Sequence, residues 1–373
     1  MASLEYSLFA RIPKLDAATL CRVGRQLGSS LELLRLAKHE PADLALHLPH
    51  AALQALRSFD QERHRADLEI LQRQQITVIG ADEAAYPPQL LEIPGAPAVL
   101  FLLGNPAALR EPQLAMVGSR HPTANGARTA RDLAFHFASR GLTITSGLAV
   151  GIDAASHGGA LAALGSTIAV CATGLDRLYP DAHADLAERI KERGALVSEF
   201  PPGTPPIARH FVQRNRLISG LSLGVLVVEA AARSGSLTTA RHAGEQGREV
   251  FAVPGSIHSP QSRGCHQLLR QGAVLVENAD DVLREIKNPH LNQIFKNDPV
   301  VLQTADDENG RLDNPAEILL DALGFESTSL DALVASTGLS STSVASLLLV
   351  LEQGGRVASD SAGRYYRVPN LIE

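Results

Sequence analysis

The stretch AMVGSRHPTANGARTARDLA, residues 115–134, is typical of a strand, a glycine turn and a helix. A dinucleotide-binding fold carries its glycine-rich phosphate loop at this point. Here the turn is Gly118-Ser119-Arg120, so an arginine stands where further glycines would be. A helix N-terminus attracts anions, and a guanidinium forms strong hydrogen bonds with phosphate. We therefore expect this turn to bind a phosphate group.

A second basic cluster lies in RHFVQRNRLISGLS, residues 209–222. Its polar and aromatic members are Arg209, Phe211, Arg214, Asn215 and Arg216. Guanidinium groups around an aromatic ring suit single-stranded nucleic acid, because cations neutralise phosphates while the ring stacks on a base. The alternative is structural: Phe211 packs in the core and the arginines pair with acids such as Glu199 or Glu229.

Small and polar residues also follow several other expected strands. The turns are SGLAVGIDAASH at 146–157, SGSLTTARHA at 234–243 and PGS at 254–256. Glycines let a backbone approach a ligand closely, and free N–H groups at helix starts favour anions. Such turns often serve only tight packing, but several along one sheet edge suit a row of phosphates.

Catalysis and metal binding find little support in the sequence. Asp153 and His157 are spaced to share a helix face, but we expect structural roles for both. No P-loop, HExxH or GxSxG motif is present, and no close carboxylate pair suggests hydrolysis. Cys21, Cys171 and Cys265 are too far apart to suggest a zinc site or a disulfide framework. We expect no catalytic residue, no metal and no cofactor.

Alternating strands and helices must position these turns. Between residues 114 and 286, seven β-branched runs alternate with amphipathic segments: LAMVG, LTITSG, STIAVCA, ALVSE, LGVLVVEA, REVFAVPG and AVLVE. The expected helices cover 123–139, 151–163, 181–193, 211–219, 236–246 and 264–271. Continuous apolar strands separated by helices predict an α/β fold, a Rossmann-like parallel sheet covered on both faces.

The flanking regions differ from this pattern. We expect a helical domain at 1–75, an extended Rossmann-like domain at 76–286, a polar linker at 287–312 and a winged-helix domain at 313–373. The extended domain begins with a connector that carries a strand at AVLFLL. The last domain is predicted from three short helices followed by a hairpin around Ser361-Ala362-Gly363.

Charge is distributed unevenly along the 373 residues, whose formal net charge is −6. Residues 200–272 hold eight arginines against three glutamates, a balance of +5, whereas 313–373 hold three arginines against eight acids, a balance of −5. Two different partners are therefore expected, with protein contact favoured over DNA reading for the acidic winged helix. No apolar run is long enough for a membrane span or signal peptide, so a cytoplasmic location is expected.

Together these motifs resemble one family. The chain resembles DNA-processing protein A (DprA, also called Smf), and the resemblance is dense over about residues 80–286. The motifs that carry it are, in order, GSRHPTANG, SGLAVGIDAASHGGAL, TGLDRLYP, FVQRNRLISGLS, SGSLTTARHAGEQGREVFAVPGS and GCHQLLRQGA. The resemblance implies a non-catalytic protein of natural transformation that binds and protects incoming single-stranded DNA, forms a homodimer and loads RecA. Longer members carry an N-terminal SAM-like or helix-hairpin-helix-like domain and a C-terminal winged helix.

The resemblance also implies site residues. The expected DNA-binding set is Gly118, Ser119, Arg120, Ser146, Gly147, Arg209, Phe211, Arg214, Asn215, Arg216, Ser234, Gly235 and Ser236. Three positions depart from the family pattern. Ala208 replaces a lysine, whose charge the neighbouring Arg209 can supply; Val212 replaces a proline, and His266 replaces an asparagine. The segment IPKLDAATLC lacks the glycine hairpin that binds duplex DNA.

Two other functions remain open. A nucleotide phosphoribohydrolase of the LOG or lysine-decarboxylase-like group has the same fold, but its PGGxGTxxE loop is replaced here by SGSLTTARHA. A winged-helix transcription factor with a ligand-sensing domain would bind duplex DNA sequence-specifically, which the acidic C-terminal region disfavours.

Overall fold

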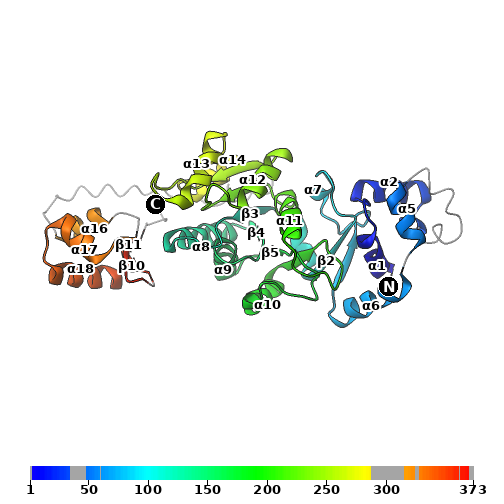
Figure 1. Ribbon diagram of the computed structural model, residues 1–373, viewed down its shortest axis with the longest axis horizontal. Helices are drawn as coiled ribbons and strands as arrows, with labels where there is room; N and C mark the ends of the chain where they lie inside the picture. The colour runs from blue at the N-terminus through cyan, green and yellow to red at the C-terminus, as the bar shows by residue number, and fades with distance from the viewer. Residues whose placement is uncertain are drawn as a thin grey trace.

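A nine-stranded sheet forms the centre of the molecule (Figure 1). The computed structural model describes residues 2–33, 48–58, 60–286, 315–323, 327–360 and 362–368. The strands are β1 (Thr77–Gly80), β2 (Val99–Gly104), β3 (Gln113–Val117), β4 (Thr143–Ser146), β5 (Thr167–Val170), β6 (Ala195–Ser198), β7 (Gly224–Val227), β8 (Glu249–Ala252) and β9 (Val274–Leu275). Their order across the sheet is β1-β2-β6-β5-β4-β3-β7-β8-β9.

Strands β3 to β9 are parallel, as the alternating pattern predicts, whereas β1 and β2 add an antiparallel edge. Strand β2 is the one expected in AVLFLL, while β1 was not predicted. The four residues of β1, TVIG, form a segment too short to show a clear period. The Rossmann-like α/β fold expected from the sequence is confirmed, with a mixed rather than wholly parallel sheet.

Alternate residues of the central strands face opposite layers. Ala115 and Val117 of β3 join the hydrophobic cluster on one face, whereas Leu114 and Met116 join the cluster on the other. All four side chains are at most 3% exposed. A strand covered on both faces needs apolar residues at every position, which explains its continuous apolar sequence.

Helices cover both faces of this sheet. On one face lie α8 (Ala124–Ser139), α9 (Ile152–Ala162) and α14 (Ala279–Glu285), and on the other α11 (Ala208–Gly220), α12 (Ser236–Glu245) and α13 (Arg263–Arg270). The remaining elements of this region are α7 (Pro88–Leu91), α10 (Ala184–Arg193) and the 3-10 turns η2 (Pro106–Arg110), η3 (Asp181–His183) and η4 (Pro260–Ser262). Helix α14 was not expected from the sequence.

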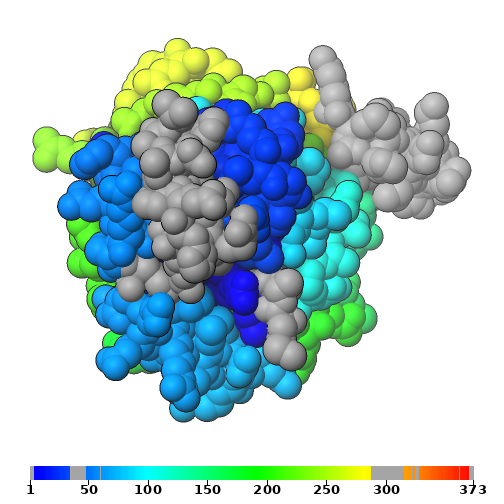
Figure 2. Space-filling view, turned by 90° about the vertical axis from the view of Figure 1, so that its right-hand side faces the viewer, coloured from blue at the N-terminus to red at the C-terminus, as the bar shows by residue number. Residues whose placement is uncertain are grey.

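The N-terminal helices cover one end of the molecule (Figure 2), and they share one hydrophobic cluster with β1 and β2. They are α1 (Ala2–Glu5), η1 (Tyr6–Arg11), α2 (Ala17–Leu27), α5 (His50–Arg57) and α6 (Gln61–Arg73). Phe9 and Leu71 belong to the same buried cluster as Phe101 of β2. Arg11 binds Asp67 at 2.5 and 2.7 Å and donates to the Pro202 carbonyl at 2.9 Å. This region therefore shares its core with the sheet.

The C-terminal region contains α16 (Pro315–Leu323), α17 (Leu330–Thr337), α18 (Ser341–Gln353), β10 (Val357–Ser359) and β11 (Tyr365–Arg367). Three helices and a hairpin are the pattern expected for a winged helix, and they surround a separate cluster that includes Leu333 and Leu348. The expected linker at 287–312 and Ser361 lie outside the described residues. Of the described helices, none alone has the length and apolar composition to cross a membrane; α17 and α18 reach both only as a pair bent by 111°.

Candidate functional site

The connections from β3 and β7 diverge at the middle of the sheet. These strands are neighbours, with Met116 opposite Leu226. The chain after β3 returns through α8 to β4 on one side, whereas the chain after β7 returns through α12 to β8 on the other. Such a switch point opens a crevice beyond the carboxyl ends of parallel strands, where ligands of this fold bind.

A cavity of about 820 Å³ lies at this switch point, and we call it the strand-end trough. Nine of the thirteen predicted residues line it: Gly118, Ser119, Arg120, Phe211, Arg214, Asn215, Ser234, Gly235 and Ser236. They come from the turn after β3, from α11 and from the start of α12. Residues separated by more than a hundred positions therefore lie around one hollow.

The turn after β3 is fixed by contacts with the chain after β7. The Ser119 amide donates to the Glu229 carbonyl at 2.7 Å. A Cβ atom on Gly118 would lie 2.6 Å from Ile152 and 2.8 Å from the Glu229 carbonyl, so glycine alone fits. Glu229 also accepts from the Thr123 amide and hydroxyl at the start of α8. In a phosphate loop, this glycine would let the backbone approach the ligand. Here Gly118 instead allows the turn to pack closely against Ile152 and Glu229.

Arg120 leaves this turn and reaches across the trough to Phe211. Its guanidinium carbon lies 5.7 Å from the centre of the Phe211 ring, and that of Arg214 lies 5.9 Å from the same centre. Both distances are within the range of cation–π attraction. Arg120 is exposed, so its guanidinium is available to an anion that enters from solvent.

Arg214 is buried, at 4% exposure, beneath the trough. Its Nη1 donates to the carbonyls of Gly147 and Val170, at the ends of β4 and β5. Burial lowers the pKa of Arg214, while the nearby carboxylate of Asp153 opposes that shift. Burial likewise raises the pKa of Asp153, which accepts from the amides of Gly147 and Ala149. Arg214 therefore ties strand ends together as well as lining the trough.

The SGS turn, residues 234–236, also lines the trough. Its two hydroxyls, of Ser234 and Ser236, are hydrogen-bonded at 2.7 Å, and the Asn215 amide donates to the Gly235 carbonyl at 3.4 Å. A Cβ on Gly235 would meet nothing within 4 Å, so this backbone faces open space. The turn can accept a ligand against its backbone.

Four predicted residues do not line the trough. Ser146 is buried and donates to the Met116 carbonyl at 2.6 Å, and Gly147 is covered by Arg214. Arg216 pairs with Glu199 at 2.6 Å, the structural alternative raised for these arginines. Arg209 is exposed on α11. DNA contact by all four stays a prediction.

Several lining residues were missed by sequence reasoning. They include Tyr179, Arg233, His121 and Gln261. Arg233 directly precedes the SGS turn, and Tyr179 is the next-to-last residue of the TGLDRLYP motif, so the motifs carried a signal that was not used. Gln261, which donates to the His121 carbonyl at 3.2 Å, lies in η4 between β8 and α13 and had no signal of its own.

Asp153 and His157 make separate contacts. The buried His157 places Nδ1 2.7 Å from the Thr167 hydroxyl, which itself donates to the Ile144 carbonyl. The Thr167 oxygen therefore accepts from His157. Burial lowers the pKa of His157 to about 3, so the ring is neutral at ordinary pH.

Within the described residues, no group of three or more His, Cys, Asp or Glu could hold a metal ion.

Of the three departures from the family pattern, two line the trough and one does not. Ala208 and Val212 line it, and the Val212 side chain is 55% exposed. The His266 Nε2 lies 3.0 Å from the Gly255 carbonyl, so this ring contacts the loop after β8.

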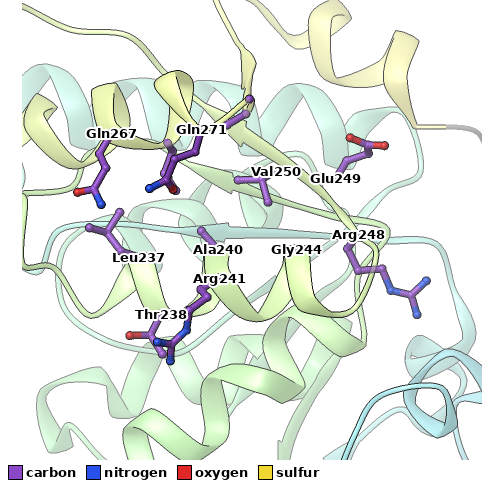
Figure 3. Close-up of a pocket in the computed structure, with 13 residues that line it drawn as sticks. Leu237, Thr238, Ala240, Arg241, Gly244, Arg248, Glu249, Val250, Gln267 and Gln271 are labelled. Carbon is purple, nitrogen blue, oxygen red and sulfur yellow. The ribbon is translucent and has the colours of Figure 1, made fainter.

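A second hollow of about 530 Å³ lies between α12 and α13. Figure 3 shows Gln267 and Gln271 of α13 facing Leu237 of α12, while Arg248 points away. Arg248 pairs with Glu92 at 3.0 Å, and Arg241 lies 3.7 Å from Glu245. Because its cations already have acidic partners, this hollow suits phosphates less well than the trough.

Fold and site together define a Rossmann-like protein with an arginine- and aromatic-lined ligand crevice at its switch point. Residues 77–287 match the family model of DNA recombination-mediator protein A, and residues 303–363 match that of the DprA winged helix domain. The chain belongs to the DNA recombination-mediator protein A family.

Relatives agree with this assignment. The chain is 44% identical to Protein Smf of Escherichia coli K12 over 307 residues, which cover 82% of this chain and 81% of that protein. The structure of DNA processing protein A from Streptococcus pneumoniae is 36% identical, with a TM-score of 0.67, over 77% of this chain and 99% of that one. The Helicobacter pylori protein, described for its single-stranded DNA binding mode, is 28% identical, with a TM-score of 0.52, over 60% and 96%.

Proposed function

We propose that this protein binds single-stranded DNA in the strand-end trough during DNA processing in natural transformation. One observation carries the proposal: the exposed guanidinium of Arg120 lies beside the Phe211 ring at the carboxyl edge of the sheet. A cation next to an aromatic ring offers one group for a phosphate and one for a base. An unpaired strand presents both groups together.

The charge of the trough supports a phosphate ligand. Among the described residues that line it, three are arginines, Arg120, Arg214 and Arg233, and one is a carboxylate, Asp153, which is 7% exposed. Arg120 and Arg233 are both exposed to solvent. Cations on the ligand side and a carboxylate held beneath them favour a polyanion.

The names of relatives support the same class of ligand and a role in recombination. The Helicobacter pylori protein is described as binding single-stranded DNA, and the family description is that of a recombination mediator. From the family resemblance we also propose that the protein loads the RecA recombinase onto the strand, acts as a homodimer and is cytoplasmic.

We propose binding without catalysis. The one carboxylate in the described trough lining accepts hydrogen bonds from two backbone amides and lies near Arg214, so it is engaged in structure. A phosphoribohydrolase would need a carboxylate that serves the chemistry; the equivalent loop here, SGSLTTARHA, contains none, and none follows at the required offset. Release of free base from nucleoside monophosphates would revive that alternative.

The test compares single-stranded and duplex oligonucleotides of equal length at 50 and 200 mM salt, with the mass of the free protein measured in parallel. We expect tighter binding of the single strand, with affinity that falls steeply as salt rises. Equal affinity for duplex, or no dependence on salt, would contradict the proposal. A monomeric mass would contradict the homodimer alone.

A further inference from the structure

Two aromatic rings meet at the rim of the trough. Tyr179 and Phe211 lie edge to face, with ring centres 5.5 Å apart and an interplanar angle of 68°. Tyr179 is 49% exposed, whereas Phe211 is only partly exposed. Arg120 and Arg214 also lie within 6 Å of the centre of the Phe211 ring. Phe211 thus has three protein neighbours, while half of the Tyr179 surface faces solvent.

The loop that carries Tyr179 is held by hydrogen bonds at several points. The Thr173 hydroxyl donates to the Arg177 carbonyl at 2.7 Å, and the Ser198 hydroxyl donates to the Thr173 carbonyl at 2.6 Å. Asp176 accepts from the Gly203 amide at 2.9 Å. A ring on a fixed loop loses little conformational freedom when a ligand covers it. Tyr179 is therefore a pre-organised surface.

We propose that Tyr179 is the base-stacking residue of the trough and that Phe211 is a positioning residue. Phe211 fixes the Tyr179 ring through its edge contact and holds Arg120 beside it, so that a phosphate and its base are bound side by side. Every base has a π face, so this contact tolerates any sequence. The bases of a duplex are already stacked on one another, so the contact also favours the single strand. The inference rests on the proposed function and assigns its base contact to a residue outside the predicted set.

The sequence contains no tryptophan, which makes a direct optical test possible. Tyr179→Trp provides a single reporter in the full-length chain. We expect its fluorescence to be quenched when oligothymidylate binds, because a base then stacks on the indole. An oligomer of the same length made of abasic deoxyribose phosphates should bind through its phosphates and leave the fluorescence nearly unchanged. Phe211→Trp, read in the same way, should respond less to the base.

Affinity measurements provide the second readout. Tyr179→Ala should weaken oligothymidylate binding about 5- to 150-fold, the range found when a base-stacking ring is removed. It should leave affinity for the abasic oligomer unchanged, because that ligand has no base to lose. Tyr179→Phe should bind normally, since stacking does not need the hydroxyl. Phe135→Ala is the matched control, because Phe135 is 46% exposed on α8 and lies outside the trough lining.

Each result decides the inference. It is wrong if Tyr179→Ala weakens both oligomers equally, or if quenching occurs at Phe211→Trp and not at Tyr179→Trp. Tyr179→Leu, compared by circular dichroism and the same titration, separates loss of the ring from loss of folding. The proposed function fails differently: Arg120→Ala would leave affinity for both oligomers unchanged, whatever Tyr179 does.

Discussion

The guanidinium of Arg214 packs directly on the backbone of Gly147. Nη1 donates to the Gly147 carbonyl at 2.7 Å, and a Cβ at position 147 would come within 2.5 Å of the same nitrogen. The end of β4 is thus fastened to α11 by a side chain that lies under the ligand crevice. Arg120, in contrast, is exposed above it. Two arginines of one trough are therefore placed differently: Arg214 is buried and bonded to strand ends, whereas Arg120 is exposed to solvent.

Removal of the exposed arginine should affect binding alone. We expect Arg120→Ala to weaken single-stranded DNA binding by about 1–3 kcal/mol, the usual value for a charge-assisted contact. The free energy of unfolding should stay within about 0.5 kcal/mol of the parent. Fluorescence anisotropy and urea titration measure the two quantities. Arg189→Ala, at an exposed position of α10, is the matched control, and an equal loss there would contradict a specific role for Arg120.

Removal of the buried arginine should affect the fold first. Arg214→Met deletes the hydrogen bonds to Gly147 and Val170 and leaves Asp153 without a nearby cation. We expect a loss of about 1.5–3 kcal/mol in the free energy of unfolding, measured by urea titration. Arg209→Ala, on the exposed side of the same helix, should change it little. Unchanged stability in Arg214→Met would show that these contacts contribute nothing net.

Two glycines of the trough should differ in their tolerance of a methyl group. Gly118→Ala places Cβ 2.6 Å from Ile152, so either the turn or α9 must move. We expect a loss of stability of about 1–3 kcal/mol, typical of overpacking, together with weaker DNA binding. Gly235→Ala has open space and should fold normally. Thermal unfolding of both variants tests the contrast, and a stable Gly118→Ala protein with normal affinity would contradict it.

His157 should make the fold sensitive to mild acid. Its pKa is lowered by burial to about 3 in the folded protein, against an ordinary value near 6.5 when unfolded. The contribution to stability is present above pH 6.5 and is lost as the pH falls towards the folded pKa. Between these values it gives a slope of about 1.4 kcal/mol per pH unit.

Urea unfolding of the parent and His157→Gln at pH 7, 6 and 5 isolates this contribution. We expect the stability difference between the two proteins to shrink as the pH falls. The raised pKa values of Asp153 and Glu199 act in the opposite direction but are present in both proteins. Parallel pH curves would refute the role assigned to His157.

The winged helix should contribute little to single-strand affinity. A helix that reads DNA is expected to carry cations on its exposed face. The exposed residues of α18 include Leu349 and Val350, and this helix contains no basic residue. Deletion of residues 313–373 should therefore change affinity for oligothymidylate less than twofold. A large loss in the same titration would overturn the protein-contact role expected from the acidic balance of this region.

Particular elements show how far local sequence predicts this fold. Strands β3 to β9 were all predicted, and in β3 to β7 every residue is buried, which leaves a mostly apolar run. Strand β1 was missed, since four residues at an edge carry too short a pattern. The placement of the N-terminal helices was also beyond local sequence. Phe9 and Phe101 share one cluster because tertiary packing brings helices and an antiparallel edge together.

The sequence by itself determined the class of fold and the turns that surround the strand-end trough, because strand period, glycine turns and helix starts are local properties. Only the tertiary structure decided what each arginine does. Arg214 contacts Gly147, 67 residues away, and Arg216 pairs with Glu199, while Arg120 stays exposed beside Phe211. The charge available to a ligand depends on burial and on partners from other elements, and these are set by packing between distant segments rather than by neighbours in the chain.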